Sequence, residues 1–313
     1  MAGIRQVIDG PAFTPLPNFL WDAAQHPSPA GLGPHWQNGV TWQEYCGGGG
    51  TAYDECLAVT GSGGTPAAQG SFAANVTQTN RGATAFTVFA EFDCSPVGQG
   101  LTQDDLEDRA AQALDKMESY QVTRAFWTGT AGYTGSPPGT AQTTVWPHLA
   151  SSSTLSDAQG ITLQTAASPV LTGGSGNDDP AVMLGRLEAS LASCYGGQGV
   201  IHIPYAALPT FTSRMLILPD SPNGPLRTLA GNLVVPGLGY TGSSPAGAAP
   251  AEGTTWIYAT GAVFGFRSEV FARQFPDTFD RAENTVKSLA SRTYLFGFEC
   301  CHLAALITLG VPV

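Results

Sequence analysis

The stretch TQDDLEDRAAQALDKMESYQVTRAFWTG, from Thr102 to Gly129, carries the strongest helical signal in the chain. Thr102 and Asp105 have the spacing of an N-terminal capping box, with Asp in place of Glu or Gln. The acidic residues that follow lie where the helix dipole favours anions. An apolar stripe then recurs at helical spacing: Leu106, Ala110, Leu114 and Met117. A helix that runs to Phe126 and is closed by Gly129 would be about 37 Å long.

A strand precedes this helix, and a second helix follows it. Residues 84–92, TAFTVFAEF, alternate in the manner of a half-buried strand. Phe86, Val88, Ala90 and Phe92 fall on one face of it, and Thr87, Phe89 and Glu91 fall on the other. Asp179 and Pro180 are a cap and first residue for the second helix, which Gly196 and Gly197 end. Further strands are expected at 199–203, 233–235, 255–259, 263–271 and within 285–309.

Composition restricts the classes of function. Of the 313 residues, 42% are hydrophobic and only 12% are charged, which is about half the usual charged share. Such a surface fits either a chain that covers itself with further copies or a loop-rich secreted β protein. The net charge is −11 and the two lysines, Lys116 and Lys287, are far apart. Tight binding of nucleic acid through clustered cations is therefore excluded, and no apolar run approaches the ~20 residues of a membrane span.

The cysteines are expected to be thiols. The N-terminal residues 1–6, MAGIRQ, lack the apolar stretch of a signal peptide, so we expect the product to remain in the cytoplasm. Particles built from the chain should then be insensitive to reductant. Cys300, Cys301 and His302 do not predict a metal site, because adjacent residues of a strand point to opposite faces. The remaining cysteines are Cys46, Cys56, Cys94 and Cys194.

No pattern of catalytic residues is present in the sequence. The chain has no phosphate-binding loop of the G-x-x-x-x-G-K-[ST] type, no H-E-x-x-H, no C-x-x-C and no G-x-S-x-G. His202 lies among Val200, Ile201 and Ile203, which favours a core histidine. The acidic run after Thr102 is a helix start and not a catalytic carboxylate pair. We therefore expect no enzyme activity, no catalytic residue, no cofactor and no metal.

Residues 1–70 are rich in aromatic side chains but show no sustained periodicity. Such a segment cannot build its own core, so we expect an extended arm that lies over another part of an assembly. The same reasoning assigns the strand before the long helix to subunit contacts. The residues expected at the subunit interface are Trp21, Trp36, Trp42, Phe86, Phe89 and Phe92.

The order of elements resembles the Hong Kong 97-type capsid fold of tailed phages, which is an α+β fold. Glu107 to Gly129 is similar to the spine helix of actinobacterial-phage members. The closest likeness lies in the C-terminal half, in the segments 180–194, 199–204, 231–236, 256–261, 263–270 and 284–306. It implies an N-terminal arm (1–70), an extended hairpin loop (71–100), spine helix and peripheral domain (101–178), axial domain (179–275) and a return to the peripheral domain (276–313).

The resemblance implies a major capsid protein that self-assembles as pentamers and hexamers into the icosahedral head of a tailed phage. The shell would enclose double-stranded DNA without sequence-specific binding, after assembly in the bacterial cytoplasm. No charged scaffolding segment precedes the arm, so either the scaffold is a separate protein or assembly proceeds without one. Portal and decoration proteins are the other candidate partners, and no membrane is expected. Two alternatives stay open: an encapsulin-type nanocompartment shell, and a secreted β-rich hydrolase or carbohydrate-binding protein with aromatics in a sugar groove.

Overall fold

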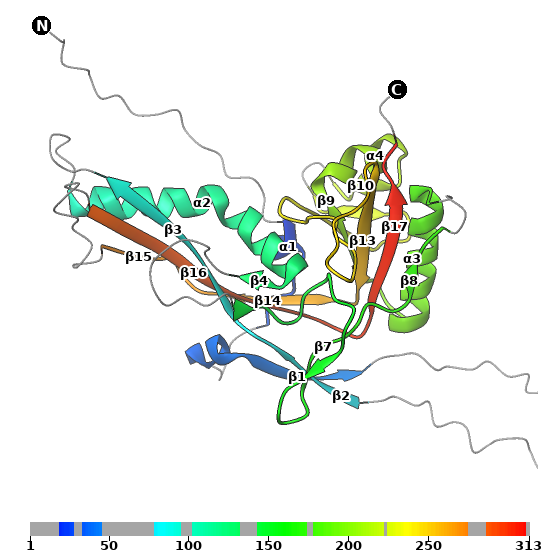
Figure 1. Cartoon of the computed structure of the whole chain (residues 1–313), viewed down its shortest axis with the longest axis horizontal. Helices are drawn as coiled ribbons and strands as arrows, with labels where there is room; N and C mark the ends of the chain where they lie inside the picture. Colours follow the sequence, from blue (N-terminus) through cyan, green and yellow to red (C-terminus); the bar gives the residue numbers. More distant parts are fainter. Residues whose placement is uncertain are drawn as a thin grey trace, which may run out of the picture.

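The computed structural model describes residues 19–27, 33–45, 78–94, 102–131, 143–173, 178–221, 224–274 and 286–310. A long helix on a sheet forms one end of the molecule, and a second sheet with two helices forms the other (Figure 1). A hairpin lies outside both, near the point where the two ends meet. The expected α+β class is confirmed. None of the described helices is long and apolar enough to cross a membrane.

The long helix is α2, Gln103–Thr128, and it forms as the sequence predicts. The Thr102 hydroxyl accepts from the backbone N–H of Asp105, whose carboxylate accepts from the backbone N–H of Thr102. At the other end Gly129 adopts a left-handed conformation, φ 71°, and donates to the carbonyl of Ala125. The 26 residues span about 39 Å.

The helix α2 covers one face of the first sheet. The strand β16 (Val286–Phe298) pairs antiparallel with β3 (Phe86–Cys94), and also with β14 (Val263–Arg267) and β15 (Phe271–Gln274). The strand expected at 263–271 is thus interrupted at 268–270. Apolar residues of β3 and β16 pack against α2 in the larger core, among them Phe86, Val88, Leu114, Phe126 and Phe296.

The second sheet has the strand order β10-β11-β12-β9-β13-β17-β8. Its core forms where Met183, Leu187 and Leu191 pack on Ile201 and Ile257. The helix α3 (Pro180–Tyr195) begins and ends at the expected caps, since Asp179 accepts from two backbone N–H groups and Gly196 is left-handed. The other elements are β8 (Val170–Leu171), β9 (Val200–Pro204), η4 (Tyr205–Ala207), α4 (Leu208–Ser213), β10 (Ile217–Pro219), β11 (Leu226–Thr228), β12 (Leu233–Gly237), β13 (Thr254–Thr260) and β17 (His302–Thr308).

Part of the expected arm has regular structure of its own. The short helix α1 (Phe19–Ala23), the 3-10 turn η1 (Gly33–Asn38) and β1 (Val40–Tyr45) all lie within residues 1–70. The strand β1 pairs with β2 (Gln78–Ala83), and β2 in turn pairs with β7 (Thr162–Gln164), beside β6 (Leu155–Ser156). A separate pair is β4 (Thr130–Ala131) with β5 (Thr143–Thr144). The described residues of this segment therefore contain helix and strand that the lack of periodicity in the sequence did not indicate.

The two ends of the molecule are joined by close packing on the C-terminal half of α2. The backbone N–H of Gly239, after β12, donates to the Thr123 hydroxyl at 2.8 Å. A Cβ atom on Gly239 would lie 2.0 Å from the carbonyl oxygen of Tyr120, so only glycine permits this approach. The Trp127 indole N–H donates to the Ser243 hydroxyl at 2.9 Å. The long helix therefore packs against both sheets, within the larger core.

Candidate functional site: a hairpin and its anchor

The hairpin formed by β1 and β2 lies outside the two larger cores, beside β7 and packed on the first sheet (Figure 1). Its strands pair antiparallel in one register, from Val40 opposite Ala83 to Tyr45 opposite Gln78. Residues 46–77 join the strands and lie outside the described residues. The hairpin therefore takes its first strand from the expected arm. The strand β3, which was expected to belong to the hairpin, lies in the sheet with β16.

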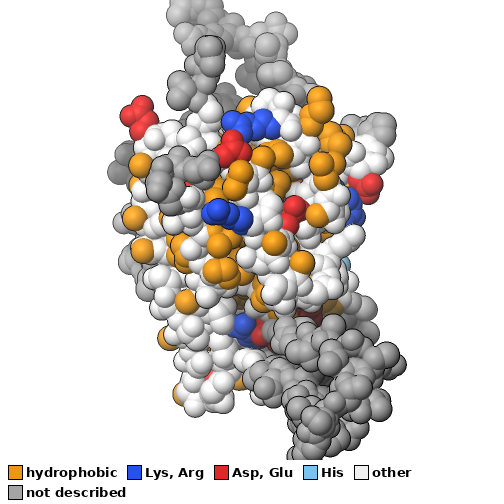
Figure 2. Space-filling model, turned by 90° about the vertical axis from the view of Figure 1, so that its right-hand side faces the viewer, with side chains coloured by type: hydrophobic (Ala, Val, Ile, Leu, Met, Phe, Trp, Pro, Cys, Tyr) orange, Lys and Arg blue, Asp and Glu red, His pale blue; other side chains and the backbone are white. Residues whose placement is uncertain are grey.

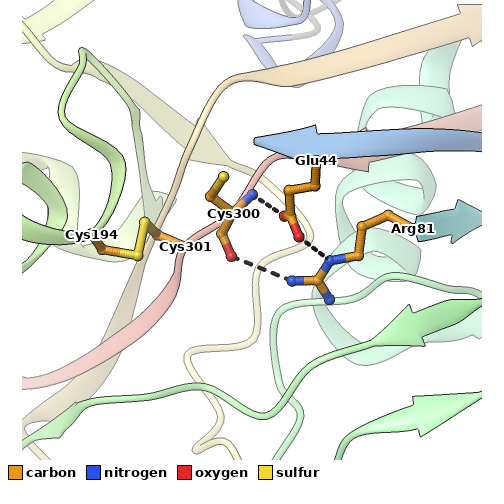
Figure 3. Close-up of polar contacts among 5 residues, drawn as sticks. All are labelled: Glu44, Arg81, Cys194, Cys300 and Cys301. Carbon is orange, nitrogen blue, oxygen red and sulfur yellow. Dashed lines mark hydrogen bonds and ion pairs between the residues drawn. A yellow bond between two sulfur atoms is a disulfide. The ribbon is translucent and has the colours of Figure 1, made fainter. Parts of the chain in front are cut away.

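A buried ion pair fixes the paired strands of the hairpin, residues 40–45 and 78–83, to the rest of the subunit, and we call these strands the hairpin base. The guanidinium of Arg81 on β2 lies 2.6 Å from the carboxylate of Glu44 on β1, and Glu44 is only 1% exposed. The same carboxylate accepts from the backbone N–H of Cys300, and Arg81 also donates to the carbonyl of Cys300 at 3.5 Å. Figure 3 shows the three residues in a closed ring of contacts. Charges taken out of water in this way are stable only while they stay paired.

The turn between β16 and β17, residues 299–301, receives this anchor. Cys300 has φ 51°, in the left-handed region that non-glycine residues rarely adopt. Next to it, Cys301 forms a disulfide with Cys194 at the end of α3, with Cα atoms 6.0 Å apart (Figure 3). Cys300 is also disulfide-bonded. The expectation that all six cysteines are thiols is therefore wrong, because the fold brings Cys194 and Cys301 within bonding reach across 107 residues.

The six residues expected at a subunit interface do not share one surface. Phe86 is 4% exposed and packs on Tyr294 and Phe296, and Trp36 is 8% exposed and stacks on Phe266. These two rings are in the subunit's own core, because α2 and β14 cover them. Trp21, Trp42, Phe89 and Phe92 are half-buried and keep some surface.

Phe89 marks the face of the first sheet that α2 does not cover. It lies opposite Ser291 of β16, and Ser291 lies opposite Phe271 of β15, so the three side chains form one row across the sheet. Phe271 is 58% exposed. The alternation along β3 that the sequence shows is confirmed, since Phe86 and Val88 are buried while Thr87 and Glu91 are exposed. We call Phe89, Ser291 and Phe271 the outer row.

Trp21 attaches the first described segment to the subunit. Its ring stacks on His26 with centroids 4.0 Å apart, and the Arg267 guanidinium lies 4.4 Å from its centroid. The backbone N–H of Gln25 donates to Val263 at 2.8 Å, and its carbonyl accepts from Gly265 at 2.9 Å. The segment thus pairs with β14 through a short parallel bridge between Gln25 and Phe264.

A second apolar surface lies on the second sheet and was missed by the sequence reasoning. Met215 is 71% exposed and Leu229 is 81% exposed, while Tyr205 and Leu218 are each more than 40% exposed. They lie beside α4, the edge strand β10 and its neighbour β11. On the end of the molecule seen in Figure 2, hydrophobic side chains spread over the surface among few charged ones. These residues can be recognised only by their exposure in the structure, because no periodicity or motif in the sequence sets them apart from core residues.

The buried histidines are structural. Both ring nitrogens of His202 lie near hydroxyls, Tyr240 at 3.0 Å and Thr260 at 3.1 Å, and burial lowers the pKa of His202 to about 3. His302 lies between the carbonyls of Thr165 and Leu149, and burial lowers its pKa to about 4. Among the described residues, no group of three or more His, Cys, Asp or Glu side chains is placed to hold a metal ion.

No family model and no curated protein matches the chain. Among solved structures it is similar to one titled Mycobacterium phage Bobi, at 12% identity and TM-score 0.49, over 99% of this chain and 96% of that one. It is also similar to the capsid of Ralstonia phage GP4, at 10% identity and TM-score 0.48, over 88% and 85%. A third similar structure is the SrpI encapsulin complex from Synechococcus elongatus, at 11% identity and TM-score 0.41, over 75% and 79%.

Proposed function

We propose that this chain is a shell-forming subunit, the major capsid protein of a tailed phage, which assembles as pentamers and hexamers into an icosahedral head around double-stranded DNA. The observation that carries the proposal is the hairpin of β1 and β2. It lies outside the two larger cores, and its base is held by a buried ion pair on the turn at Cys300 and by packing on the first sheet. A hairpin fixed in this way offers a neighbouring copy a surface to pack against.

The surface chemistry supports the same proposal. The outer row of the first sheet and the exposed residues of the second sheet place apolar side chains on the outside. Exposed apolar side chains that gather into a patch mark contacts between proteins, and we propose this role for both surfaces. We propose that residues 101–178 and 276–313 act as the peripheral domain and residues 179–275 as the axial domain. Phe89, Phe92, Trp21 and Trp42 remain the proposed interface residues from the sequence.

The charge of α2 fits a wall that faces DNA without binding it. Asp104, Asp108 and Asp115 are exposed along one side of the helix. Carboxylates there repel phosphates, so packaged DNA would not adhere to the shell. Portal, scaffold and decoration proteins remain proposed partners.

The secreted alternative is disfavoured by the position of the aromatic rings. Because Cys194 and Cys301 form a disulfide, the expectation of free thiols no longer argues against a secreted protein. A sugar groove, however, needs exposed aromatic faces, and Trp36 and Phe86 are in the subunit's own core.

Replacement of the hairpin connection tests the proposal. In the test variant a short Gly-Ser linker replaces residues 46–77, so that β1 and β2 stay joined. We expect the variant to fold but to form no closed shells in sedimentation velocity, under conditions in which the unaltered chain forms them. Assembly of the variant at the same rate and to the same size would contradict the proposal.

A further inference from the structure

The turn of residues 299–301 contacts three parts of the molecule: α3, the turn after β13 and the hairpin. The Glu299 carboxylate accepts from the Tyr195 hydroxyl of α3 at 3.0 Å, and its backbone pairs with the turn after β13 through Gly261 and Ala262. Cys300 holds the hairpin through Glu44 and Arg81, and Cys301 is bonded to Cys194 of α3.

The left-handed conformation of Cys300 depends on these ties. For a non-glycine residue such a conformation costs energy and persists only where the surroundings enforce it. Its two backbone groups are the ones that contact Glu44 and Arg81, so the position of the hairpin base depends on the shape of this turn. Cys300 is itself disulfide-bonded, and the Cys301–Cys194 bond is a second covalent tie at the next residue.

We propose that Cys194 and Cys301 form an oxidative modification site that locks the hairpin onto the subunit. With Cys194 and Cys301 as thiols, the turn is held by hydrogen bonds, the buried ion pair and the disulfide of Cys300. The disulfide form also holds Cys301 to α3, and through it the backbone of Cys300. The consequence for assembly rests on the proposed function: a subunit with a looser hairpin base adjusts to its neighbours, and oxidation then stiffens the shell.

The oxidant is a small-molecule disulfide, RSSR. The thiolate of Cys194, which is half-buried, attacks RSSR to give a mixed disulfide and releases RS⁻. The thiolate of Cys301, which is almost fully buried, then attacks the sulfur of Cys194 and releases the second RS⁻. Two cysteine thiols are oxidised to one disulfide, and RSSR is reduced to two RSH once the released thiolates take up the two protons.

Amide hydrogen exchange on the unassembled chain tests the proposal. The oxidised chain is compared with the double variant Cys194→Ala/Cys301→Ala, without reductant, so that the bond of Cys300 is kept in both. We expect residues 40–45 and 78–83 to exchange at least about threefold faster in the double variant, with residues 110–126 of α2 unchanged. The Ser193→Ala variant, changed on the same turn of α3, should exchange like the unaltered chain.

A second measurement does not depend on the folding of the variant. The reduced chain is titrated with glutathione disulfide, and bond formation is mapped by mass spectrometry alongside hairpin exchange. Protection of the hairpin should rise with the Cys194–Cys301 bond, not with the bond of Cys300. Equal hairpin exchange with and without the Cys194–Cys301 bond, or thiols at Cys194 and Cys301 that still react with iodoacetamide after oxidation, would overturn the proposal. Because the chain is unassembled in both tests, that failure leaves the proposed shell function standing.

Discussion

Arg81 and Glu44 lie on opposite strands of the hairpin, one diagonal step apart, with the Nε and Oε2 atoms separated by 2.6 Å in the protein interior. Removal of one buried charge leaves the other without compensation, at a cost of about 3–5 kcal/mol. We therefore expect Glu44→Gln and Arg81→Met each to lower the free energy of unfolding by that amount in urea denaturation.

The double variant Glu44→Gln/Arg81→Met should lose much less than the sum of the two single losses, because it leaves no charge unpaired. The exposed pair of Arg227 and Asp220 supplies the control. Asp220→Asn should change stability by less than about 1 kcal/mol. Additive losses in the double variant would mean that the two side chains do not depend on each other.

The outer row should be needed for assembly and not for folding. Phe89→Ser with Phe271→Ser removes two rings from the face of the first sheet that α2 leaves uncovered. We expect the far-ultraviolet circular dichroism of the monomer to be kept and shell formation to be lost. Phe86→Ser is the matched control, because it empties a core position on the same strand and should cost at least about 3 kcal/mol. Unfolding of the outer-row variant would place those rings in the subunit's own core.

Acid should destabilise the subunit through its buried histidines. The pKa of His202 is lowered to about 3 by burial, so between pH 6.5 and 5 the unfolded chain takes up a proton that the folded chain does not. The stability contributed by the neutral ring is present above the ordinary pKa and is lost as the pH falls below it, by about 1.5 kcal/mol at pH 5. The pKa values of His302 and His148 are also lowered by burial, so these residues add to the loss of stability as the pH falls.

Urea denaturation at four pH values between about 5 and 6.5 measures how the free energy of unfolding changes with pH. Most carboxyl groups titrate below this range. His202→Gln keeps hydrogen-bonding groups near Tyr240 and Thr260 but does not titrate, so its slope should be smaller by about 1.5 kcal/mol over the range. Identical slopes in the two proteins would show that His202 is already protonated in the folded state.

The particles should contain no covalent cross-link through lysine. The chain has two lysines, Lys116 on α2 and Lys287 on β16, and residues 40–83 contain none. An amide bond between subunits through an outstretched hairpin would need an amine there. Boiling in detergent with reductant should release one band near 32.4 kDa. A ladder of larger bands that survives reductant would contradict this.

Local signals predicted much of this fold. The caps at Thr102 and Gly129 set the bounds of α2, and those at Asp179 and Gly196 set the bounds of α3, because a cap acts within one turn of its helix. The alternation along β3 likewise predicted which of its side chains are buried.

Contacts between residues distant in sequence were not predictable in the same way. The strand β1 finds its partner β2 across residues 46–77, and Cys194 finds Cys301 across 107 residues, and neither pairing leaves a local pattern. The aromatic rings of Trp36 and Phe86 were assigned to the surface because the elements that cover them come from elsewhere in the chain. Only one weak signal in the sequence pointed to the pair of Glu44 and Arg81. The two residues carry opposite charges and lie in segments that are otherwise almost uncharged.

Electron microscopy of the purified chain, with its scaffold if one is required, tests the central proposal most directly. We predict closed icosahedral shells in which pentamers and hexamers are resolved, with the hairpin of β1 and β2 lying across a neighbouring subunit. A monodisperse monomer that remains at high concentration under every assembly condition, or shells in which the hairpin contacts only its own subunit, would contradict the account.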